Sequence, residues 1–156
     1  MQILGRKAGI YGMIGGQCAD LEAEESKDAM TDGMLLFIHE HKTAALIEAS
    51  MMIGAVLAGA GEETVKALEK CASHIGIAFQ IQDDILDVVG DAASLGKPIG
   101  SDEKNHKQTY VTLVGLSEAE KEVEARSGEA VSILKSLPGD SAFLQKLTEY
   151  LIHRNK

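Results

Sequence analysis

A single long helical pattern at residues 62–90 limits the folds that are open to this chain. Apolar residues recur in it with the 3.6-residue period of an α-helix and predict one buried stripe. They are Leu68, Ala72, Ile75 and Phe79. Near its end the stretch reads "GIAFQIQDDILDVVGD" (76–91), where Asp83, Asp84 and Asp87 interrupt the apolar run. Aspartate is a poor residue for a helix interior, and burying an unpaired carboxylate is costly. The three aspartates therefore need an explanation beyond packing.

The rest of the chain predicts further helices and no strands. We expect helices over residues 1–22, 32–60, 109–116, 117–137 and 141–156, with "HEHKT" (39–43) as the place where the second could break. Thr31 or Asp32 would cap the second helix, and Ser117 with Glu120 has the spacing of a capping box. Residues 90–108 form a long loop, of a kind that is usually functional or disordered. The predicted fold class is all-α: an antiparallel helical bundle that spans residues 1–156 as one domain.

Glycines at positions 12, 15 and 16 weaken the first predicted helix. They make more sense if another element packs closely against it.

Composition excludes several classes of protein. A chain of 156 residues can bury a sizeable core, and its net charge of −9 argues against a nucleic-acid binder held by phosphate contacts. The most apolar run, "ALIEASMMIGAVLAGAG" (45–61), contains Glu48 and is too short for a secure transmembrane helix. No signal-peptide pattern follows the first residues. We therefore expect a cytoplasmic protein in which Cys18 and Cys71 are reduced, buried packing residues.

The three aspartates have two readings. On a helix they share one face, because Asp87 lies four residues after Asp83 and three after Asp84. Close carboxylates repel one another unless a cation intervenes, and oxygen ligands without cysteine suit Mg²⁺. The alternative is a solvated acidic patch. The apolar neighbours make this alternative less favoured, because they leave little room for a freely solvated face. They are Ile81, Ile85, Leu86, Val88 and Val89.

Three further polar groups have ordinary explanations when each is taken alone. Gln17 and Asp20 lie three apart on the first helix, where helix-end chemistry is the simpler account. Lys42 and Thr43 begin a core helix, and a lysine there usually reaches out to the surface. Lys97, Asp102 and Lys107 lie in the long loop as solvated charges. Taken together with the aspartates, they suggest an electrostatic clamp in which Mg²⁺ holds a diphosphate and lysines neutralise its outer oxygens.

Four segments in this order resemble motifs of the trans-polyprenyl diphosphate synthases. They are "GMIGGQCADLE" (12–22), "HKTAALIEAS" (41–50), "GIAFQIQDDILDVVGD" (76–91) and "LGKPIGSDEKNHKQTY" (95–110). The closing "YLIHRNK" (150–156) is similar to the tail of the bacterial farnesyl/geranylgeranyl branch. DDxxD alone is a weak signal, whereas FQxxDDxxD followed by GKxxGxDxxxxKxT is strong.

The resemblance implies a reaction. In this family an allylic diphosphate ionises with the help of Mg²⁺, isopentenyl diphosphate attacks the carbocation, and a proton is lost. By resemblance, Asp83, Asp84 and Asp87 are the second aspartate-rich motif, with Asp83 as the first choice for a direct metal ligand. By the same resemblance, the positions that contact the allylic diphosphate are Lys42, Lys97 and Lys107, with Thr43 and Gln80 beside them. Phe79 matches a residue near the substrate tails. Gln17 and Asp20 match a polar pair that lines the cavity.

One departure from the family pattern is large. Family members carry a first aspartate-rich motif upstream of these segments, and no DDxxD occurs in residues 1–75. The isopentenyl diphosphate site also lies upstream in the family, so the chain resembles the C-terminal half of a synthase. Two hypotheses follow: half of a prenyltransferase active site, inactive alone, or a non-catalytic helical subunit that pairs with another synthase chain. Half a bundle leaves apolar faces such as residues 45–58 without partners, and we expect a homodimer or other self-association.

Overall fold

The computed structural model describes residues 1–25, 30–89, 108–152 and 154, and this part of the chain is helical without strands. The predicted all-α class is therefore confirmed. The elements are α1 (Gln2–Ala8), α2 (Met13–Glu25), α3 (Asp32–Ile38), the π-helix η1 (His39–Ala44), α4 (Ala45–Leu57), α5 (Glu62–Val89), α8 (Tyr110–Val114), α9 (Leu116–Ser136) and α10 (Ala142–Ile152).

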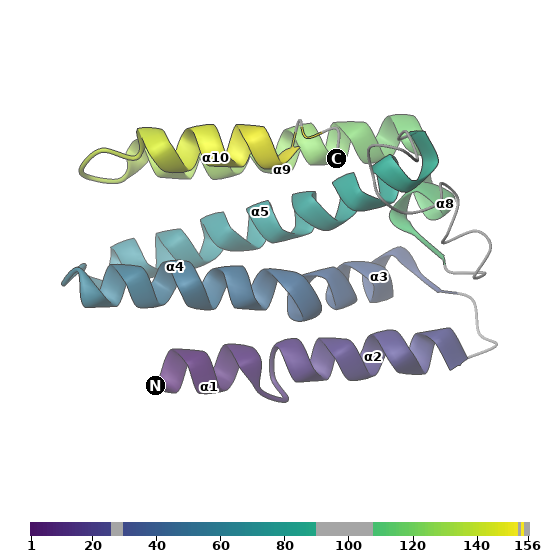
Figure 1. The fold of residues 1–156 in the computed structure, drawn as a ribbon, viewed down its shortest axis with the longest axis horizontal. Helices are drawn as coiled ribbons and strands as arrows, with labels where there is room; N and C mark the ends of the chain where they lie inside the picture. The colour runs from purple at the N-terminus through teal and green to yellow at the C-terminus, as the bar shows by residue number, and fades with distance from the viewer. Residues whose placement is uncertain (26–29, 90–107, 153, 155–156) are drawn as a thin grey trace.

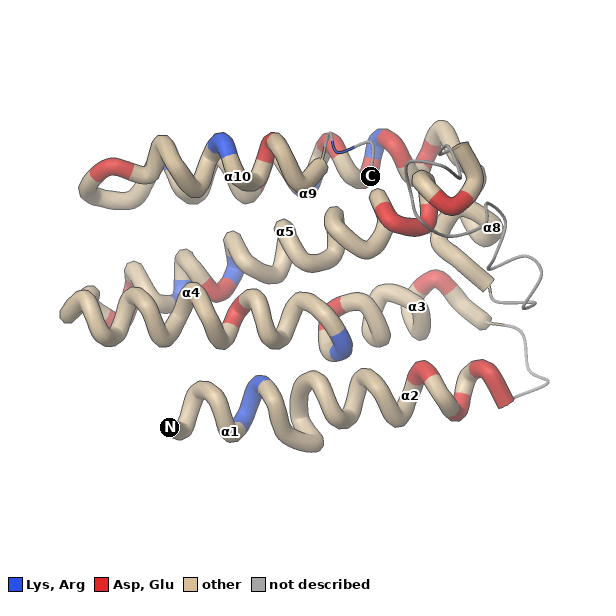
Figure 2. The backbone as a smooth tube through the Cα atoms, viewed as in Figure 1, with Lys and Arg blue, Asp and Glu red and all other residues tan. Residues whose placement is uncertain are grey.

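The helices lie in rows that run roughly along one direction (Figure 1). The α1–α2 row forms one edge of the molecule and packs against the row made by α3, η1 and α4. The long helix α5 comes next and contacts α4 on one side and α9 on the other, with α10 packed beside α9. Acidic residues gather in the last turns of α2 and α5, as Figure 2 shows. α5 is thus the central helix, and its acidic end lies at one end of the bundle.

The core confirms much of the stripe predicted on α5. Ala72 and Ile75 are buried, whereas Leu68 and Phe79 are half-buried. Two clusters form around this helix. The larger contains Leu35, Ile77, Ile81, Tyr110 and Ile152, and the smaller contains Cys71, Ile75, Ala130 and Leu134. Burial raises the pKa of the Cys71 thiol to about 11. The prediction that Cys18 is buried was wrong, because this residue on α2 is exposed.

The prediction of one helix over residues 1–22 was also wrong, since the chain breaks between α1 and α2. Glycine allows the tight turn at this break, because a Cβ at Gly12 would lie 1.9 Å from the carbonyl oxygen of Lys7. The expected close neighbour does exist at Gly16, where a Cβ would lie 2.3 Å from the backbone nitrogen of Lys42. Glycine at 16 therefore lets α2 approach η1 at backbone distance.

Residues 32–57 are continuously helical, so "HEHKT" is not a break but most of a π-helical turn. Thr31 caps the run as predicted, and its side chain accepts a hydrogen bond from the Met34 N–H at 3.2 Å. Across from η1, a Cβ at Gly76 would lie 2.4 Å from the Ala44 Cα. A second glycine contact therefore brings η1 close to α5.

The capping box predicted at Ser117 is wrong. α9 begins at Leu116 after Gly115, whose φ of 87° favours glycine, and no side chain caps it. A capping box exists instead at Thr109 and Thr112, at the start of α8. The last helix ends at Ile152 rather than running to 156, and the predicted loop lies almost wholly outside the described residues.

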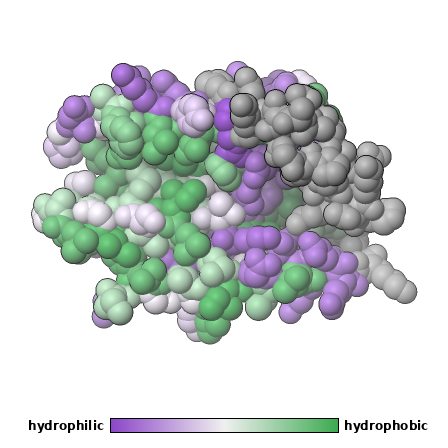
Figure 3. All heavy atoms as spheres, in the orientation of Figure 1, coloured by the Kyte–Doolittle hydropathy of each residue, from purple (hydrophilic) through white to green (hydrophobic). Residues whose placement is uncertain are grey.

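Apolar side chains remain exposed on the outer row. Those on or between α1 and α2 are Leu4, Ile10, Tyr11, Ile14 and Leu21. In the view of Figure 3, hydrophobic residues cover much of the left and lower parts of the face, and hydrophilic ones gather at the lower right. None of the helices that the structure describes combines the length and the apolar composition of a membrane span.

Candidate functional site

The three aspartates lie in the last turns of α5 but take different partners. The Oδ1 atom of Asp83 accepts a hydrogen bond from Nη2 of Arg154. The Oδ2 atom of Asp84 accepts one from the Tyr110 N–H at 2.7 Å. Asp87 is only 2% exposed and lies within the fold. Their shared helical face therefore does not give them one shared environment.

Arg154 is a site residue to which sequence analysis gave no role. Besides Asp83, it donates to the Phe79 carbonyl at 3.3 Å, and its guanidinium carbon lies 3.6 Å from the centroid of the Phe79 ring. An ion pair and a cation–π contact thus hold Arg154 over α5. The only signal in the sequence was the resemblance of the tail "YLIHRNK" to family members.

Lys42 and Asp20 are brought together from two predicted motifs. Nζ of Lys42 on η1 lies 2.5 Å from Oδ2 of Asp20 on α2. The Asp20 side chain is 7% exposed and that of Lys42 is 31% exposed, so the lysine reaches partly into solvent. The protein itself therefore supplies an anionic partner for Lys42. Gln17 lies one turn before Asp20 on the same helix.

The other predicted site residues lie near these groups or outside the described part. Thr43 follows Lys42 on η1, and Gln80 lies one turn before Asp84 on α5; both are half-buried. η1 packs against α5, which places the two segments on neighbouring elements. Lys97, Asp102 and Lys107 lie outside the described residues.

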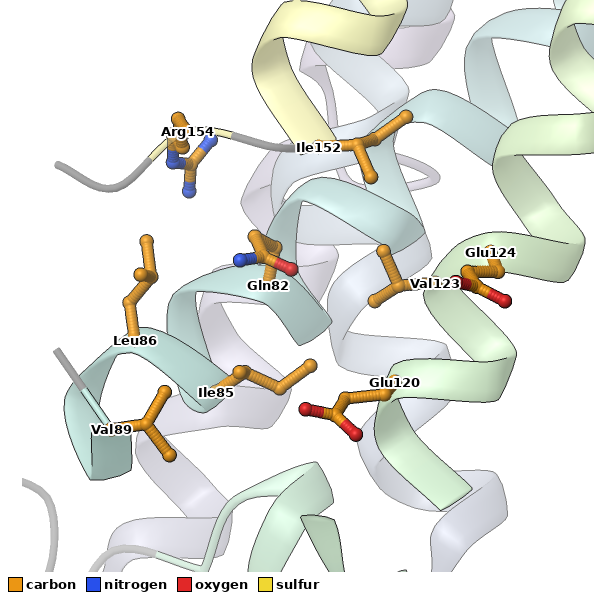
Figure 4. Close-up of a pocket in the computed structure, with 9 residues that line it drawn as sticks. All are labelled: Gln82, Ile85, Leu86, Val89, Glu120, Val123, Glu124, Ile152 and Arg154. Carbon is orange, nitrogen blue, oxygen red and sulfur yellow. The ribbon is translucent and has the colours of Figure 1, made fainter. Parts of the chain in front are cut away.

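A cavity of about 660 Å³ lies beside the aspartate-bearing end of α5. Figure 4 shows that it lies between α5, α9 and the end of α10. Its lining residues are Gln82, Ile85, Leu86, Val89, Glu120, Val123, Glu124, Ile152 and Arg154. Arg154 is the one group that this cavity shares with the contacts of Asp83. Among the described residues, none of the predicted site residues lines this cavity.

Sequence analysis also missed an ion cluster between α1, α4 and α5. Nζ of Lys7 pairs with Glu48 and lies 2.6 Å from Oε1 of Glu69. Burial alone would lower the pKa of Lys7, but hydrogen bonds to the two glutamates outweigh it and the pKa is raised. Glu48 inside the most apolar run was the signal that a cationic partner was needed.

The donor chemistry of the α5 aspartates fits a hard divalent cation. Mg²⁺ binds one or two carboxylates and fills its remaining positions with water and phosphate oxygens. Asp83 and Asp87, four residues apart on one helix, provide two carboxylates of this kind. In the described residues no group of three or more His, Cys, Asp or Glu side chains is arranged to hold a metal ion.

Comparison with known proteins finds consistent relatives. A family model described as polyprenyl synthetase matches residues 6–149. Farnesyl diphosphate synthase from Escherichia coli (strain K12) is 46% identical, covering 98% of this chain and 52% of that protein. Farnesyl diphosphate synthase from Bacillus subtilis (strain 168) is 40% identical, covering 95% and 49%.

A solved structure has the same arrangement of helices. It is a geranyltransferase from Helicobacter pylori complexed with magnesium and isoprenyl diphosphate, 35% identical with a TM-score of 0.78, covering 97% of this chain and 49% of that one. The chain thus spans about half the length of the curated relatives it matches, and the matched part is their C-terminal half.

Proposed function

We propose that this chain, which belongs to the polyprenyl synthetase family, carries half of the active site of a prenyltransferase. The whole enzyme would condense an allylic diphosphate with isopentenyl diphosphate in isoprenoid biosynthesis. The observation that carries the proposal is the family match over residues 6–149, which includes every residue assigned to the clamp. The names of the farnesyl diphosphate synthases that resemble it over this range support the same reaction.

The residues divide into four roles. Asp83 and Asp87 would hold Mg²⁺, which supplies positive charge to a departing diphosphate when bound. Lys42, Lys97 and Lys107 would neutralise outer phosphate oxygens, with Thr43 and Gln80 beside them. Phe79 would lie near the prenyl tail, and Gln17 would line the cavity with Asp20. Asp20 holds the Lys42 ammonium on η1 by their ion pair, so this cation is positioned before any anion arrives.

Alone, this chain should bind a magnesium diphosphate complex weakly and should not condense prenyl diphosphates at a useful rate. The clamp in these residues meets one face of a diphosphate, whereas ionisation requires charge neutralisation on both faces. Orientation of the second substrate is lost as well, an effect worth up to roughly 7–11 kcal/mol of barrier.

Two measurements test this function. Calorimetry with MgCl₂ and inorganic pyrophosphate should give binding that Asp83→Ala removes and that the exposed control Glu63→Gln on α5 keeps. An assay with Mg²⁺, isopentenyl diphosphate and an allylic diphosphate should yield no prenyl product longer than the allylic substrate. Robust turnover that Asp83→Ala abolishes would contradict the claim that the chain alone is inactive.

A second candidate is a non-catalytic helical subunit that pairs with another synthase chain. It is favoured by the exposed apolar residues of the outer row, such as Ile14 and Leu21. The same residues support the proposal of a homodimer or other self-association, because apolar patches of this kind favour burial. Sedimentation that shows a monomer at high concentration would count against self-association.

A cytoplasmic location is also part of the proposal. Cys18 and Cys71 are both free, which agrees with a reducing compartment. Fractionation of cells that express the chain, with immunodetection, would test this location.

A further inference from the structure

We propose that Asp84 is a positioning residue rather than a metal ligand: its carboxylate fixes the start of α8 to α5. This inference rests on the proposed function, because it assigns different tasks to the aspartates of one motif. It concerns residues 108–110, the first described residues after the segment that contains Lys97 and Lys107.

The bond that carries the inference joins two elements far apart in the chain. The Tyr110 N–H donates to Oδ2 of Asp84 at 2.7 Å across 26 residues of sequence, in a partly buried place. Tyr110 is the first residue of α8, and the first N–H groups of a helix have no carbonyl partner within it. The Asp84 carboxylate supplies that partner, and a charged acceptor makes such a bond short and strong.

The residues beside Tyr110 are held as well. The Gln108 Oε1 atom accepts from the Met30 N–H at 3.0 Å, just before α3. Thr109 is 4% exposed and forms the capping box with Thr112. Tyr110 itself is 7% exposed and belongs to the main core cluster. Asp84 therefore completes an anchor that ties one short stretch of chain to the segment before α3 and to α5.

The position of Asp84 on the helix separates it from Asp83. Adjacent residues point roughly 100° apart around an α-helix, whereas residues four apart nearly align. Asp83 and Asp87 therefore lie nearly in line along α5, while the Asp84 oxygen is directed to α8. Turning that oxygen towards the line of Asp83 and Asp87 would leave the Tyr110 N–H without its acceptor, which is unfavourable in a partly buried place.

This role requires an acceptor oxygen but not a negative charge. Asparagine keeps the acceptor and loses the charge, whereas alanine loses both. A metal-ligand role makes the opposite demand, because Mg²⁺ selects carboxylates and the Asn variant would lose the charge that attracts it. The two roles therefore predict different results for Asp84→Asn. The anchor role predicts that this variant keeps pyrophosphate binding, and the metal-ligand role predicts that it loses that binding.

The experiment compares Asp84→Asn, Asp84→Ala and Asp83→Asn in the full chain. Hydrogen exchange of the Tyr110 amide reports the anchor, and calorimetry with MgCl₂ and inorganic pyrophosphate reports ion binding. Asp84→Ala should speed the exchange by about tenfold or more, as expected for losing a hydrogen bond to a charged group. Asp84→Asn should keep both slow exchange and pyrophosphate binding. Asp83→Asn should keep slow exchange and lose binding.

Two results would overturn the inference. One is a loss of pyrophosphate binding in Asp84→Asn as large as in Asp83→Asn, with the exchange of Tyr110 unchanged. The other is an Asp84→Ala chain that is folded by circular dichroism and keeps slow exchange at Tyr110. If the unsubstituted chain binds no pyrophosphate, the proposed function fails, and the exchange measurement still decides the role of Asp84 as an anchor.

Discussion

The outer α1–α2 row and the central α5–α9 pair are built from the same kind of sequence but are held in different ways. α1 has no buried residue and α2 buries only Gly16 and Asp20, whereas α5 buries ten residues. The outer row is joined to the rest by the Lys7 cluster, by the Lys42–Asp20 pair and by the close approach at Gly16. Both regions are helical, and the packing partners decide whether an apolar face is covered.

The largest expected effect is in the core of the central pair. Leu134→Ala removes most of a fully buried side chain from the smaller core cluster, which contains Cys71, Ile75 and Ala130. It should lower the free energy of unfolding by about 2–5 kcal/mol. The matched control is Leu21→Ala on α2, where the leucine is 53% exposed and the loss should be within about 0.5 kcal/mol. Urea unfolding of both variants measures the difference. Equal losses would show that the outer row is buried in solution, as a dimer would require.

The next effect tests whether ions hold the outer row. Lys7→Met leaves Glu48, whose side chain is 5% exposed, without its cation. We expect a loss of about 2–3 kcal/mol, typical of an unsatisfied buried charged group. Lys66→Met is the control, because Lys66 pairs with Glu62 at 2.7 Å in an exposed place and should cost under about 0.5 kcal/mol. Similar unfolding midpoints for the two variants would contradict this view of α1.

A third change tests the close approach of α2 to η1. Gly16→Ala introduces a Cβ that would lie 2.3 Å from the backbone nitrogen of Lys42. It should lower the free energy of unfolding by about 1–3 kcal/mol. Gly5→Ala on α1 has nothing within 4 Å of the added Cβ and should be neutral or stabilising by up to about 1 kcal/mol. Thermal unfolding of the two variants checks the sign. Tolerance at both sites would mean that α2 can move away from η1 freely.

The smallest effect concerns pH and separates the two regions again. Burial, with Arg126 and Lys70 nearby, lowers the pKa of His74 on α5, whereas residues 1–25 contain no histidine. The unfolded chain therefore takes up this proton first. Stability from His74 is complete above the unfolded pKa of about 6.5 and is lost as pH falls through that value towards the folded pKa. Unfolding of wild type and His74→Gln across this range should differ in slope, and parallel curves would exclude the effect.

Local signals predicted much of the fold. The limits of α5, the cap at Thr31 and the all-α class depend on periodicity and on residues within one helical turn. The break between α1 and α2 and the failed capping box at Ser117 depend on backbone geometry at Gly12 and Gly115, which composition does not reveal.

The candidate site shows the same limit over longer distances. The aspartates were found because charges interrupt an apolar run, but their partners lie far along the chain. Arg154 is 71 residues from Asp83, and Lys7 is 41 residues from Glu48. A single sequence without such a contact in view cannot assign one carboxylate to an ion and its neighbour to an anchor.

The π-helical turn η1 changes the helical phase between α3 and α4, which lie in one row. A wider turn delays the rotation of the chain, and over its six residues the lag amounts to roughly 100°, about one α-helical residue. α3 contacts α2 and α8, while α4 contacts α1 and α5. Deleting one residue between 39 and 44 would restore regular phase and turn α3 away from its neighbours relative to α4. Lys42 lies within the π-helical turn. A change in the rotation between α3 and α4 would therefore also change the direction of the Lys42 side chain.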